Sequence, residues 1–358
     1  MKKTSKRVTI ISRESDEKTI DVRLLEEELK RRGLEVKTLC RLLTKEKSVK
    51  ALGYAGHVLK QEAAILRSDA VVLDTYCIPA SMLPHRKGTE IVQMWHALGA
   101  VKKFGWQTVG KDDGTSERTA KLMKMHRGYD HVICASDITA GHFCEAFGAT
   151  RDKIAKYGLP RIDYIRGIAL GSEKQKTADR IYGRYPEIRG QKVILYAPTF
   201  RRNGEDDGGR LVRALEDAGY AAVVKLHPLY RNTDAAHQGN AVYDDEFSSY
   251  EWLSVADAVI SDYSSLAIEA TLSDKPLYLY LYDMDGYSRS TGLNIDFSKE
   301  PVAPYAFTDA EELTRAIGGE YDFDALKKFR DRYIDIDIGD VDKGYCTSKL
   351  ADFIESLV

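Results

Sequence analysis

Short apolar, β-branched runs alternate with amphipathic stretches along almost the whole chain. This alternation is typical of βα units that build parallel sheets. The pattern therefore predicts an α/β fold. The expected strands are Val8–Ile11, Val36–Leu39, Ala70–Leu73, Ile91–Trp95, Val132–Ala135, Val193–Ala197, Ala222–Leu226, Ala258–Ile260 and Leu277–Leu281. Helices are expected over 17–32, 137–147, 178–185, 209–218, 249–256, 265–272 and 309–317.

The two halves of the chain show the same pattern, and a polar stretch rich in glycine and lysine, 167–192, separates them. Such a stretch is typical of a boundary between domains. We expect two Rossmann-like domains that face a cleft, an N-terminal domain over 1–170 and a C-terminal domain over 171–358.

The charge balance narrows the class of ligand. The 358 residues contain 53 Lys and Arg against 55 Asp and Glu, a formal net charge of -2. A general nucleic-acid binder would carry a basic excess, so nucleic acid is not an expected partner and any anion site must be local.

Cysteine usage and hydropathy indicate the compartment. The five cysteines are scattered, with no close pair that would indicate zinc or a redox dithiol, which fits a reduced cytoplasmic setting. No apolar run approaches the roughly 18 residues of a membrane span. We expect any membrane contact to be peripheral, on the inner face of the cell membrane.

Polar residues follow several predicted strands directly, where ligands bind in open parallel sheets. His96 follows the strand Ile91–Trp95, and Pro198 to Arg202 follow the first strand of the second half. His227-Pro228 and Ser261-Asp262-Tyr263-Ser264-Ser265 follow two further strands.

Ser264 and Ser265 open a predicted helix, where hydroxyls and free backbone N–H groups can hold an anion. Either serine could instead be a simple N-cap. Arg201, Lys225 and His227 lie at neighbouring strand ends, and this favours a phosphate.

His96 belongs to the other domain, and a histidine near its ordinary pKa is suited to accept a hydroxyl proton at neutral pH. The neighbouring Trp95 is interpreted as a core residue. His227 could be held structurally by Pro228, but its place beside Lys225 favours a functional role.

Two acidic pairs, Asp283 with Asp285 and Asp335 with Asp337, resemble metal-binding spacings, but we interpret both as structural and expect neither a metal nor a cofactor. The basic segment 118–127 carries interleaved Leu122 and two methionines. It is either a membrane-surface helix or a basic helix face, and we favour the latter.

Five ordered blocks resemble the CDP-glycerol glycerophosphotransferase family, and together they cover roughly residues 90 to 300. They are Gln93-Met-Trp-His-Ala-Leu-Gly99 with Lys102-Lys-Phe-Gly105, Gly158-Leu-Pro-Arg-Ile-Asp163, Leu195-Tyr-Ala-Pro-Thr-Phe-Arg201, Lys225-Leu-His-Pro228 and Ser261-Asp-Tyr-Ser-Ser-Leu-Ala-Ile-Glu269. Two stretches depart from the commonest family pattern, namely Ala97-Leu98-Gly99 and Lys343-Gly344-Tyr345-Cys346.

The resemblance implies a glycosyltransferase-B-like fold with the acceptor on the N-terminal domain and the CDP donor on the C-terminal domain. It implies transfer of glycerol phosphate, or a related polyol phosphate, from a CDP-activated donor to a cell-envelope polymer or lipid-linked primer in teichoic acid or capsule synthesis. His96 and His227 match the histidines important to the family. The residues expected to bind the donor are Thr199, Arg201, Lys225, Asp262, Ser264, Ser265 and Glu269.

Two other functions fit the same pattern. A nucleotide-sugar glycosyltransferase would share the fold and would release a nucleoside diphosphate in place of CMP. A non-catalytic nucleotide-binding protein would bind CDP-glycerol without turnover, and the presence of both histidines disfavours it.

Overall fold

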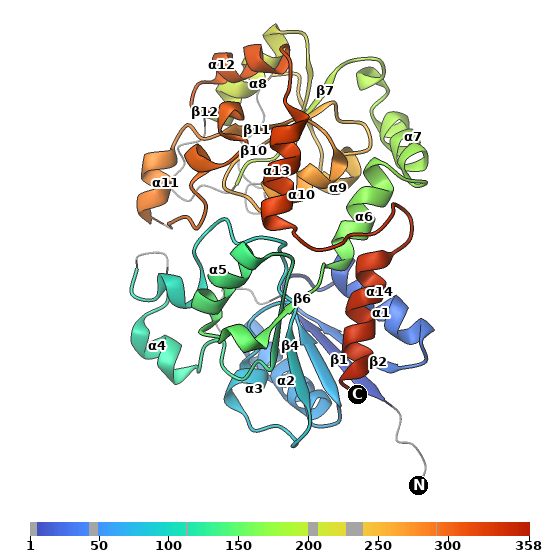
Figure 1. The fold of residues 1–358 in the computed structure, drawn as a ribbon, viewed down its shortest axis with the longest axis vertical. Coiled ribbons are helices and arrows are strands. Elements are labelled where there is room, and N and C mark those ends of the chain that lie inside the picture. The colour runs from blue at the N-terminus through green and yellow to red at the C-terminus, as the bar shows by residue number, and fades with distance from the viewer. Residues whose placement is uncertain (1–5, 43–48, 112–113, 200–206, 227–238, 291) are drawn as a thin grey trace. The chain divides into compact units, whose positions relative to one another are not determined.

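The computed structural model describes residues 6–42, 49–111, 114–199, 207–226, 239–290 and 292–358. The chain forms two compact units (Figure 1). Unit 1 comprises Met1–Asp163 and Ile334–Val358, and unit 2 comprises Tyr164–Tyr333.

Unit 1 is built on a six-stranded sheet in the order β2-β1-β3-β4-β5-β6. All of its strand pairs are parallel, with Val8 opposite Val36 on one side and Ala70 on the other. The strands are β1 (Arg7–Ser12), β2 (Glu35–Cys40), β3 (Ala70–Leu73), β4 (Glu90–Gln93), β5 (His131–Cys134) and β6 (Ile154–Lys156).

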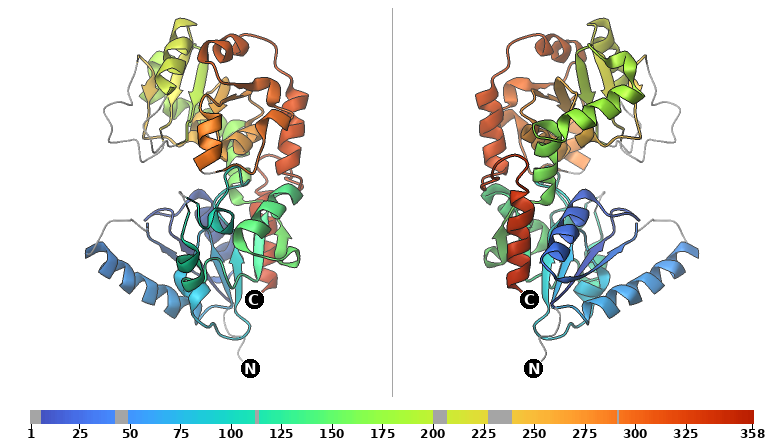
Figure 2. Two further views of the ribbon diagram at one scale, coloured as in Figure 1. Left: turned by 90° about the vertical axis from the view of Figure 1, so that its left-hand side faces the viewer. Right: turned by 90° about the vertical axis from the view of Figure 1, so that its right-hand side faces the viewer.

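Helices cover both faces of this sheet, and Figure 2 shows α2 on the side opposite to α1 and α14. The helices are α1 (Ile20–Arg31), α2 (Val49–Ile65), α3 (Ile78–Met82), α4 (Glu117–Leu122), α5 (Asp137–Phe147) and α14 (Tyr345–Ser356). Strand residues such as Val71 and Ile91 pack with Phe143 and Phe147 of α5 in the core. Burial of this continuous apolar surface is what stabilises the unit.

The C-terminal segment belongs to unit 1, which differs from the expected division at residue 170. Asp163 accepts hydrogen bonds from the backbone N–H groups of Cys346 and Thr347, at 3.1 and 2.7 Å, and so satisfies the first turn of α14. Arg32, just after α1, donates to the carbonyl and the hydroxyl of Ser348, both at 2.9 Å. A purely sequential division of the chain therefore misplaces its last helix.

Unit 2 carries a second six-stranded sheet in the order β12-β11-β10-β7-β8-β9, also parallel throughout. The strands are β7 (Val193–Tyr196), β8 (Ala221–Val224), β9 (Val242–Tyr243), β10 (Ala258–Ser261), β11 (Leu277–Tyr280) and β12 (Ala306–Phe307). The helices are α6 (Pro160–Ala169, shared with unit 1), α7 (Lys174–Arg184), α8 (Gly208–Asp217), α9 (Ser249–Trp252), α10 (Leu266–Glu269), α11 (Met284–Ser290), α12 (Ala310–Ile317) and α13 (Phe323–Tyr333).

Every strand predicted from the pattern is present, and two parallel α/β sheets confirm the fold class. The strands β6, β9 and β12 were not predicted, because runs of two or three residues carry no readable period. The helix expected over 265–272 is instead the single turn α10 followed by a 3-10 turn, Ala270–Ser273.

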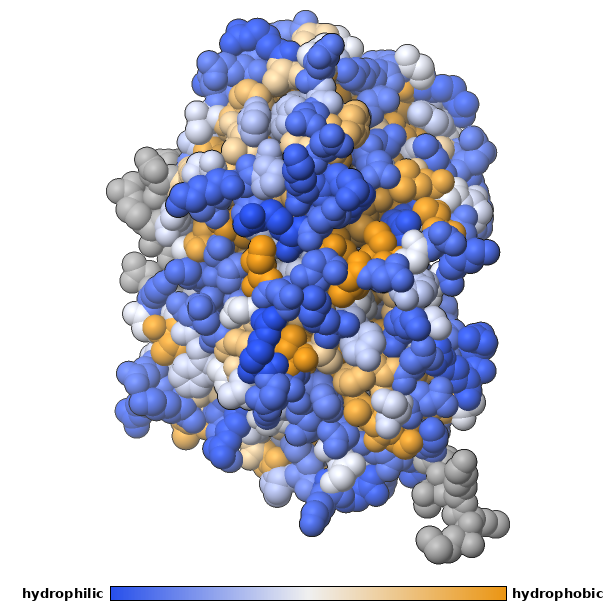
Figure 3. Space-filling model, viewed as in Figure 1, coloured by the Kyte–Doolittle hydropathy of each residue, from blue (hydrophilic) through white to orange (hydrophobic). Residues whose placement is uncertain are grey.

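The face of the protein shown in Figure 3 is largely hydrophilic, with apolar residues in small scattered groups. Among the described residues, no helix combines the length and the apolar character needed to cross a membrane.

Candidate functional site

His96 lies just beyond the carboxyl end of β4, on a turn with unusual backbone geometry. Trp95 has a φ of +63°, a left-handed conformation that is uncommon for a bulky residue. The fully buried Gln93 holds this turn, since its side chain accepts from the Trp95 N–H at 2.9 Å and donates to the Thr75 carbonyl at 3.1 Å. Left-handed non-glycine residues persist where the surroundings over-determine them, often at functional sites.

The contacts of His96 fix its tautomer. Its Nδ1 lies 2.8 Å from the backbone oxygen of Asp74. A carbonyl oxygen only accepts hydrogen bonds, so Nδ1 carries the proton and Nε2 of the neutral ring is left as a proton acceptor. Glu14 places Oε1 3.7 Å from the same Nδ1, and the His96 side chain remains one-third exposed. This is the arrangement that a general base requires.

A cavity of about 280 Å³ adjoins His96. Its walls include Arg13 and Glu14 from the end of β1, Thr75 and Tyr76 from the end of β3, and Trp95. In the sheet, β2 lies on one side of β1 and β3 lies on the other, so the order in which successive strands are added reverses between β1 and β3. Ligands in open α/β sheets bind at such a switch point.

Asp74, the first residue after β3, is a feature that the sequence analysis missed. It is only 1% exposed, and neither carboxylate oxygen accepts a hydrogen bond from the residues that the structure describes. Burial raises the pKa of Asp74 to about 6, and the nearby hydroxyls of Ser12 and Thr75 and the His96 ring reduce the effect. A polar residue directly after a strand at the switch point was the available signal.

Aromatic rings pack against His96 and against one another at this site. Trp95 stacks on Phe104 at 4.6 Å between ring centroids and lies 4.1 Å from the His96 ring, so it serves both the core and the cavity wall. His126, edge-on to Trp95 at 6.0 Å, is 7% exposed. Burial, with a contribution from Arg13, lowers the pKa of His126 to about 3 and keeps the ring neutral.

In unit 2 the predicted donor residues Thr199 and Asp262 meet across the switch point between β7 and β10. Asp262 accepts from the Thr199 N–H at 2.9 Å and from its hydroxyl at 2.6 Å. Both residues are buried. Asp262 therefore holds the start of the loop after β7 in place, which is a positioning role.

Lys225 is placed differently from what we expected of a donor-binding cation. Its ammonium group lies 2.8 Å from Asp244 Oδ2 and 2.6 Å from the Asp244 carbonyl, with 8% of the side chain exposed. Trp252 Nε1 and Tyr185 Oη also donate to the Asp244 carboxylate, at 2.8 Å each. The Lys225 charge is thus compensated inside the protein.

The remaining unit 2 residues surround the short helix α10. Ser264 is half-buried, and its hydroxyl accepts from the Leu266 N–H at 3.2 Å. Ser265 precedes the helix without a capping hydrogen bond from its side chain. Glu269 is buried and accepts from the Tyr250 hydroxyl at 2.7 Å. Of these three, the two serines are the ones with side chains partly open to solvent.

Two predicted residues, Arg201 and His227, lie outside the described residues. The acidic pairs have structural contacts: Asp283 accepts from the Tyr263 hydroxyl at 3.2 Å, and Asp335 pairs with Lys156 at 2.6 Å. Within the described ranges there is no group of three or more His, Cys, Asp and Glu side chains able to hold a metal ion.

Similar proteins share this fold over most of its length. A solved structure of the wall teichoic acid polymerase TagF has a TM-score of 0.73 at 18% identity and covers 98% of this chain and 88% of that chain. The UDP-GlcNAc 2-epimerase from Methanocaldococcus jannaschii has a TM-score of 0.59 at 11% identity, with 98% and 99% covered. These similarities support the expected glycosyltransferase-B-like fold.

Relatives in sequence are teichoic acid enzymes. The teichoic acid ribitol-phosphate primase of Bacillus spizizenii is 32% identical over 80% of this chain and 75% of its own length. The glycerol-phosphate primase of Bacillus subtilis is 29% identical over 84% and 77%. The poly(ribitol-phosphate) polymerase of B. spizizenii is 32% identical over 75% of this chain but only 44% of its own length.

The family model described as CDP-Glycerol:Poly(glycerophosphate) glycerophosphotransferase matches residues 1–351, nearly the whole chain. The family expected from the five motif blocks is confirmed, and with it the class of enzyme, a transferase. The chain belongs to the CDP-glycerol:poly(glycerophosphate) glycerophosphotransferase family.

Proposed function

We propose that the protein transfers glycerol phosphate, or a related polyol phosphate, from a CDP-activated donor to a hydroxyl of a cell-envelope polymer or lipid-linked primer. The observation that carries this proposal is the geometry of His96. Its Nδ1 proton is engaged by the Asp74 carbonyl at 2.8 Å, and its Nε2 is left to accept a proton beside a cavity. Family membership supplies the donor class.

In this reaction the acceptor oxygen attacks the phosphorus that bears glycerol, in line with the leaving group. The bond from that phosphorus to the CMP oxygen breaks, and CMP leaves with the electron pair. His96 Nε2 takes the proton of the attacking hydroxyl. Positioning and charge stabilisation supply most of the rate enhancement, as in other phosphoryl transfers.

The proposed donor site lies in unit 2, with Ser264 and Ser265, Arg201 and His227 contacting the diphosphate. Asp262, Thr199 and Glu269 would position the surrounding loops, as their internal hydrogen bonds support. Lys225 acts with them through Asp244. One of the TagF structures is a variant soaked with CDPG, which supports this donor for a protein of the same fold.

The polyol and the setting complete the proposal. The relatives include both ribitol-phosphate and glycerol-phosphate primases, so CDP-ribitol and CDP-glycerol are both candidate donors. We place the enzyme in the cytoplasm, in peripheral contact with the inner face of the membrane, where a lipid-linked acceptor is available. Divalent metal is not required in this scheme.

One experiment tests the class and the donor together. Purified protein is incubated with CDP-glycerol, CDP-ribitol or UDP-glucose and a lipid-linked acceptor, and the released nucleotide is identified. Release of CMP with either CDP-polyol, unaffected by EDTA, is expected. Release of UDP from UDP-glucose alone would make the protein a glycosyltransferase, and binding of CDP-glycerol without turnover would make it a non-catalytic protein.

A further inference from the structure

A second, larger cavity lies next to the His96 cavity in unit 1. It has a volume of about 540 Å³, within the range of small-ligand sites. Met125 and His126 line both cavities, so the two share a wall. The indole of Trp95 contacts the rings of His96 and His126, at 4.1 and 6.0 Å, which places the second cavity one aromatic layer from the proposed base.

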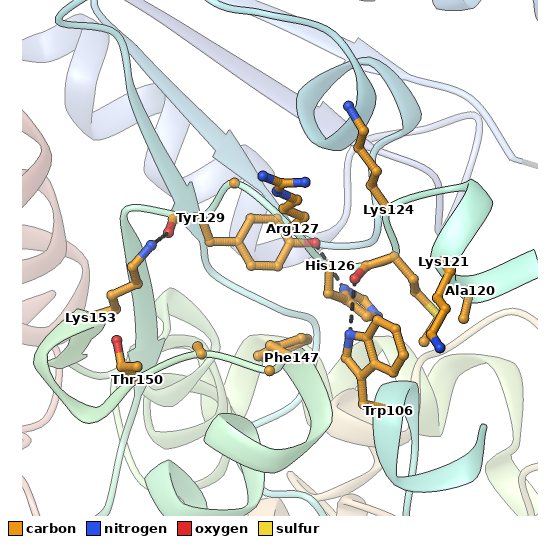
Figure 4. A pocket seen from close by; sticks show the side chains of 14 residues that line it. Trp106, Ala120, Lys121, Lys124, His126, Arg127, Tyr129, Phe147, Thr150 and Lys153 are labelled. Atoms are coloured by element: carbon orange, nitrogen blue, oxygen red, sulfur yellow. Dashed lines mark hydrogen bonds between the residues drawn. The ribbon is translucent and has the colours of Figure 1, made fainter. Parts of the chain in front are cut away.

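The charge of the second cavity is one-sided. Its fourteen lining residues include four cationic side chains and no Asp or Glu. Figure 4 shows these cations around a floor of aromatic rings from Trp106, Phe147 and Tyr129. The four cations are Lys121, Lys124, Arg127 and Lys153. In a chain with a net charge of -2, such a cluster produces a local positive potential and attracts anions.

The cations differ in how far they are already engaged. Lys121 pairs with Glu117 at 2.6 Å. Lys153 donates to the Tyr129 carbonyl at 2.6 Å, and Lys124 donates to the Met82 carbonyl at 3.2 Å. Neither carbonyl compensates a full charge. Arg127 is exposed and forms no ion pair within the described part of the chain. Uncompensated charge is therefore greatest at Arg127, Lys124 and Lys153.

Two residues that line the second cavity have energetically unfavourable, left-handed backbone conformations. Lys124 and His126 both have left-handed φ angles, +44° and +59°, within the turn that follows α4. The Met125 carbonyl between them is fixed by the Trp106 indole N–H at 3.0 Å, and His126 Nδ1 lies 2.9 Å from the Tyr129 hydroxyl. Together with Trp95, three of the five left-handed non-glycine residues among the described residues line the two cavities. Strain concentrated in this way is typical of ligand sites.

We propose that this cavity binds a phosphate or diphosphate group of the acceptor and thereby brings the acceptor hydroxyl to His96. The cationic side chains contact the phosphate oxygens. The aromatic floor accommodates the organic part of the acceptor, and free inorganic phosphate has no such part. The proposal rests on the proposed function, because it assumes an acceptor that is modified beside His96. The cavity is then a subsite of unit 1 for acceptors that carry a phosphate or a diphosphate.

The test uses a soluble acceptor analogue, a glycosyl diphosphate with a short alkyl chain, and the Lys124→Gln, Arg127→Gln double variant. Loss of two charge-assisted contacts should raise KM for the analogue by roughly tenfold or more, while kcat and KM for the CDP donor change by less than about twofold. The matched control is Lys60→Gln, Arg67→Gln, which removes two exposed cations of unit 1 that line neither cavity. The charge-conserving Lys124→Arg, Arg127→Lys variant should keep most of the affinity.

Equilibrium binding separates this proposal from the function it rests on. Calorimetric titration of the analogue without donor should show the same loss of affinity in the double variant, whether or not transfer is detected. If binding is lost as expected but no CDP-polyol supports turnover, the cavity stands and the proposed function falls. Unchanged KM and Kd for the analogue would overturn the cavity assignment.

A membrane lipid is the other source of such an anion. Co-sedimentation with phosphatidylcholine vesicles, with and without phosphatidylglycerol, is therefore measured for the same variants. If the double variant loses binding to anionic vesicles but keeps its affinity for the soluble analogue, the cavity binds lipid headgroups and the acceptor proposal is wrong.

Discussion

The two units differ in the hydrogen bonding of the aspartate that lies at the switch point of each sheet. Between β1 and β3 of unit 1, the buried Asp74 carboxylate accepts no hydrogen bond within the described ranges, and the neighbouring His96 keeps Nε2 available. Between β7 and β10 of unit 2, the Asp262 carboxylate is also buried but accepts two hydrogen bonds from Thr199. The same type of residue at the same place in the fold therefore has two different uses.

This difference separates groups that act on a substrate from groups that hold the protein in shape. In unit 2 the polar side chains Asp262, Lys225 and Glu269 all have internal partners, so they position loops. In unit 1 the polar groups surround an open cavity. Substitution of His96 should accordingly reduce catalysis, whereas substitution of Lys225 or Asp262 should mainly reduce stability.

The largest effect is expected for His96→Ala, which removes the proposed base. Turnover should fall by about 10²- to 10⁴-fold while affinity for CDP-glycerol, measured by calorimetry, stays nearly unchanged. His131→Ala is the control, because His131 is a unit 1 histidine that pairs with Glu90 at 3.2 Å and lines neither cavity. Substantial turnover in the His96 variant would remove the base assignment.

Lys225→Met should mainly cost stability. It leaves the buried Asp244 carboxylate without its cation, which typically costs about 3–5 kcal/mol. Arg180→Met is the matched control, since its pair with Glu251 is largely exposed on the arginine side and should cost about 0–1 kcal/mol. Denaturant unfolding measures both. Normal stability of the Lys225 variant with a raised KM for the donor would restore Lys225 as a direct donor contact.

Asp262→Ala tests the loop after β7. It removes acceptors from the Thr199 N–H and hydroxyl, and we expect a loss of about 2–3 kcal/mol in unfolding free energy and a raised KM for the donor. Thr199→Val keeps the backbone bond and should cost about half as much. Equal stability of wild type and the Asp262 variant would show that these hydrogen bonds contribute nothing net.

Asp74→Asn should change the stability of the protein in a way that depends on pH. Because burial raises the pKa of Asp74 from 3.8 to about 6, the folded state binds this proton more tightly than the unfolded state does. Folding stability should therefore fall as pH rises from about 4 to 6 and then level off. The Asn variant lacks this loss, so its stability relative to wild type should be higher at pH 7 than at pH 4 by up to about 3 kcal/mol.

The surrounding groups set the control for this titration. His96 and Glu14 act electrostatically on Asp74, so unfolding curves are also recorded in the His96→Ala and Glu14→Gln backgrounds. A wild type and an Asp74→Asn variant with parallel pH profiles would mean that Asp74 is ionised at little cost in the folded protein.

Sequence reasoning found the strand ends but not the partners of the residues there. The strands of four or more residues were readable because their apolar runs are long enough to recognise, and His96, Asp262 and Lys225 follow such runs. The partner of Lys225 was not readable, because Asp244 follows β9, a strand of only two residues. The burial of Asp74 was not readable either, since it depends on packing between segments far apart in the chain.

The division expected at residue 170 does not account for the place of the last helix, for a related reason. Helix α14 has an ordinary amphipathic pattern, and nothing in that pattern says which unit it covers. The contacts of Asp163 and Arg32 decide it, and both are made over more than 180 residues of sequence.

The return of Ile334–Val358 to unit 1 also has a consequence for synthesis on the ribosome. Unit 2 is a continuous stretch, Tyr164–Tyr333, and all of it is translated before Ile334–Val358. Domains generally fold as units, beginning with the parts of the chain that leave the ribosome first. The contacts of Arg32 and Asp163 with this segment cannot form until Ile334–Val358 has left the ribosome. A chain truncated after Tyr333 should therefore carry a protease-resistant unit 2 and a protease-sensitive unit 1.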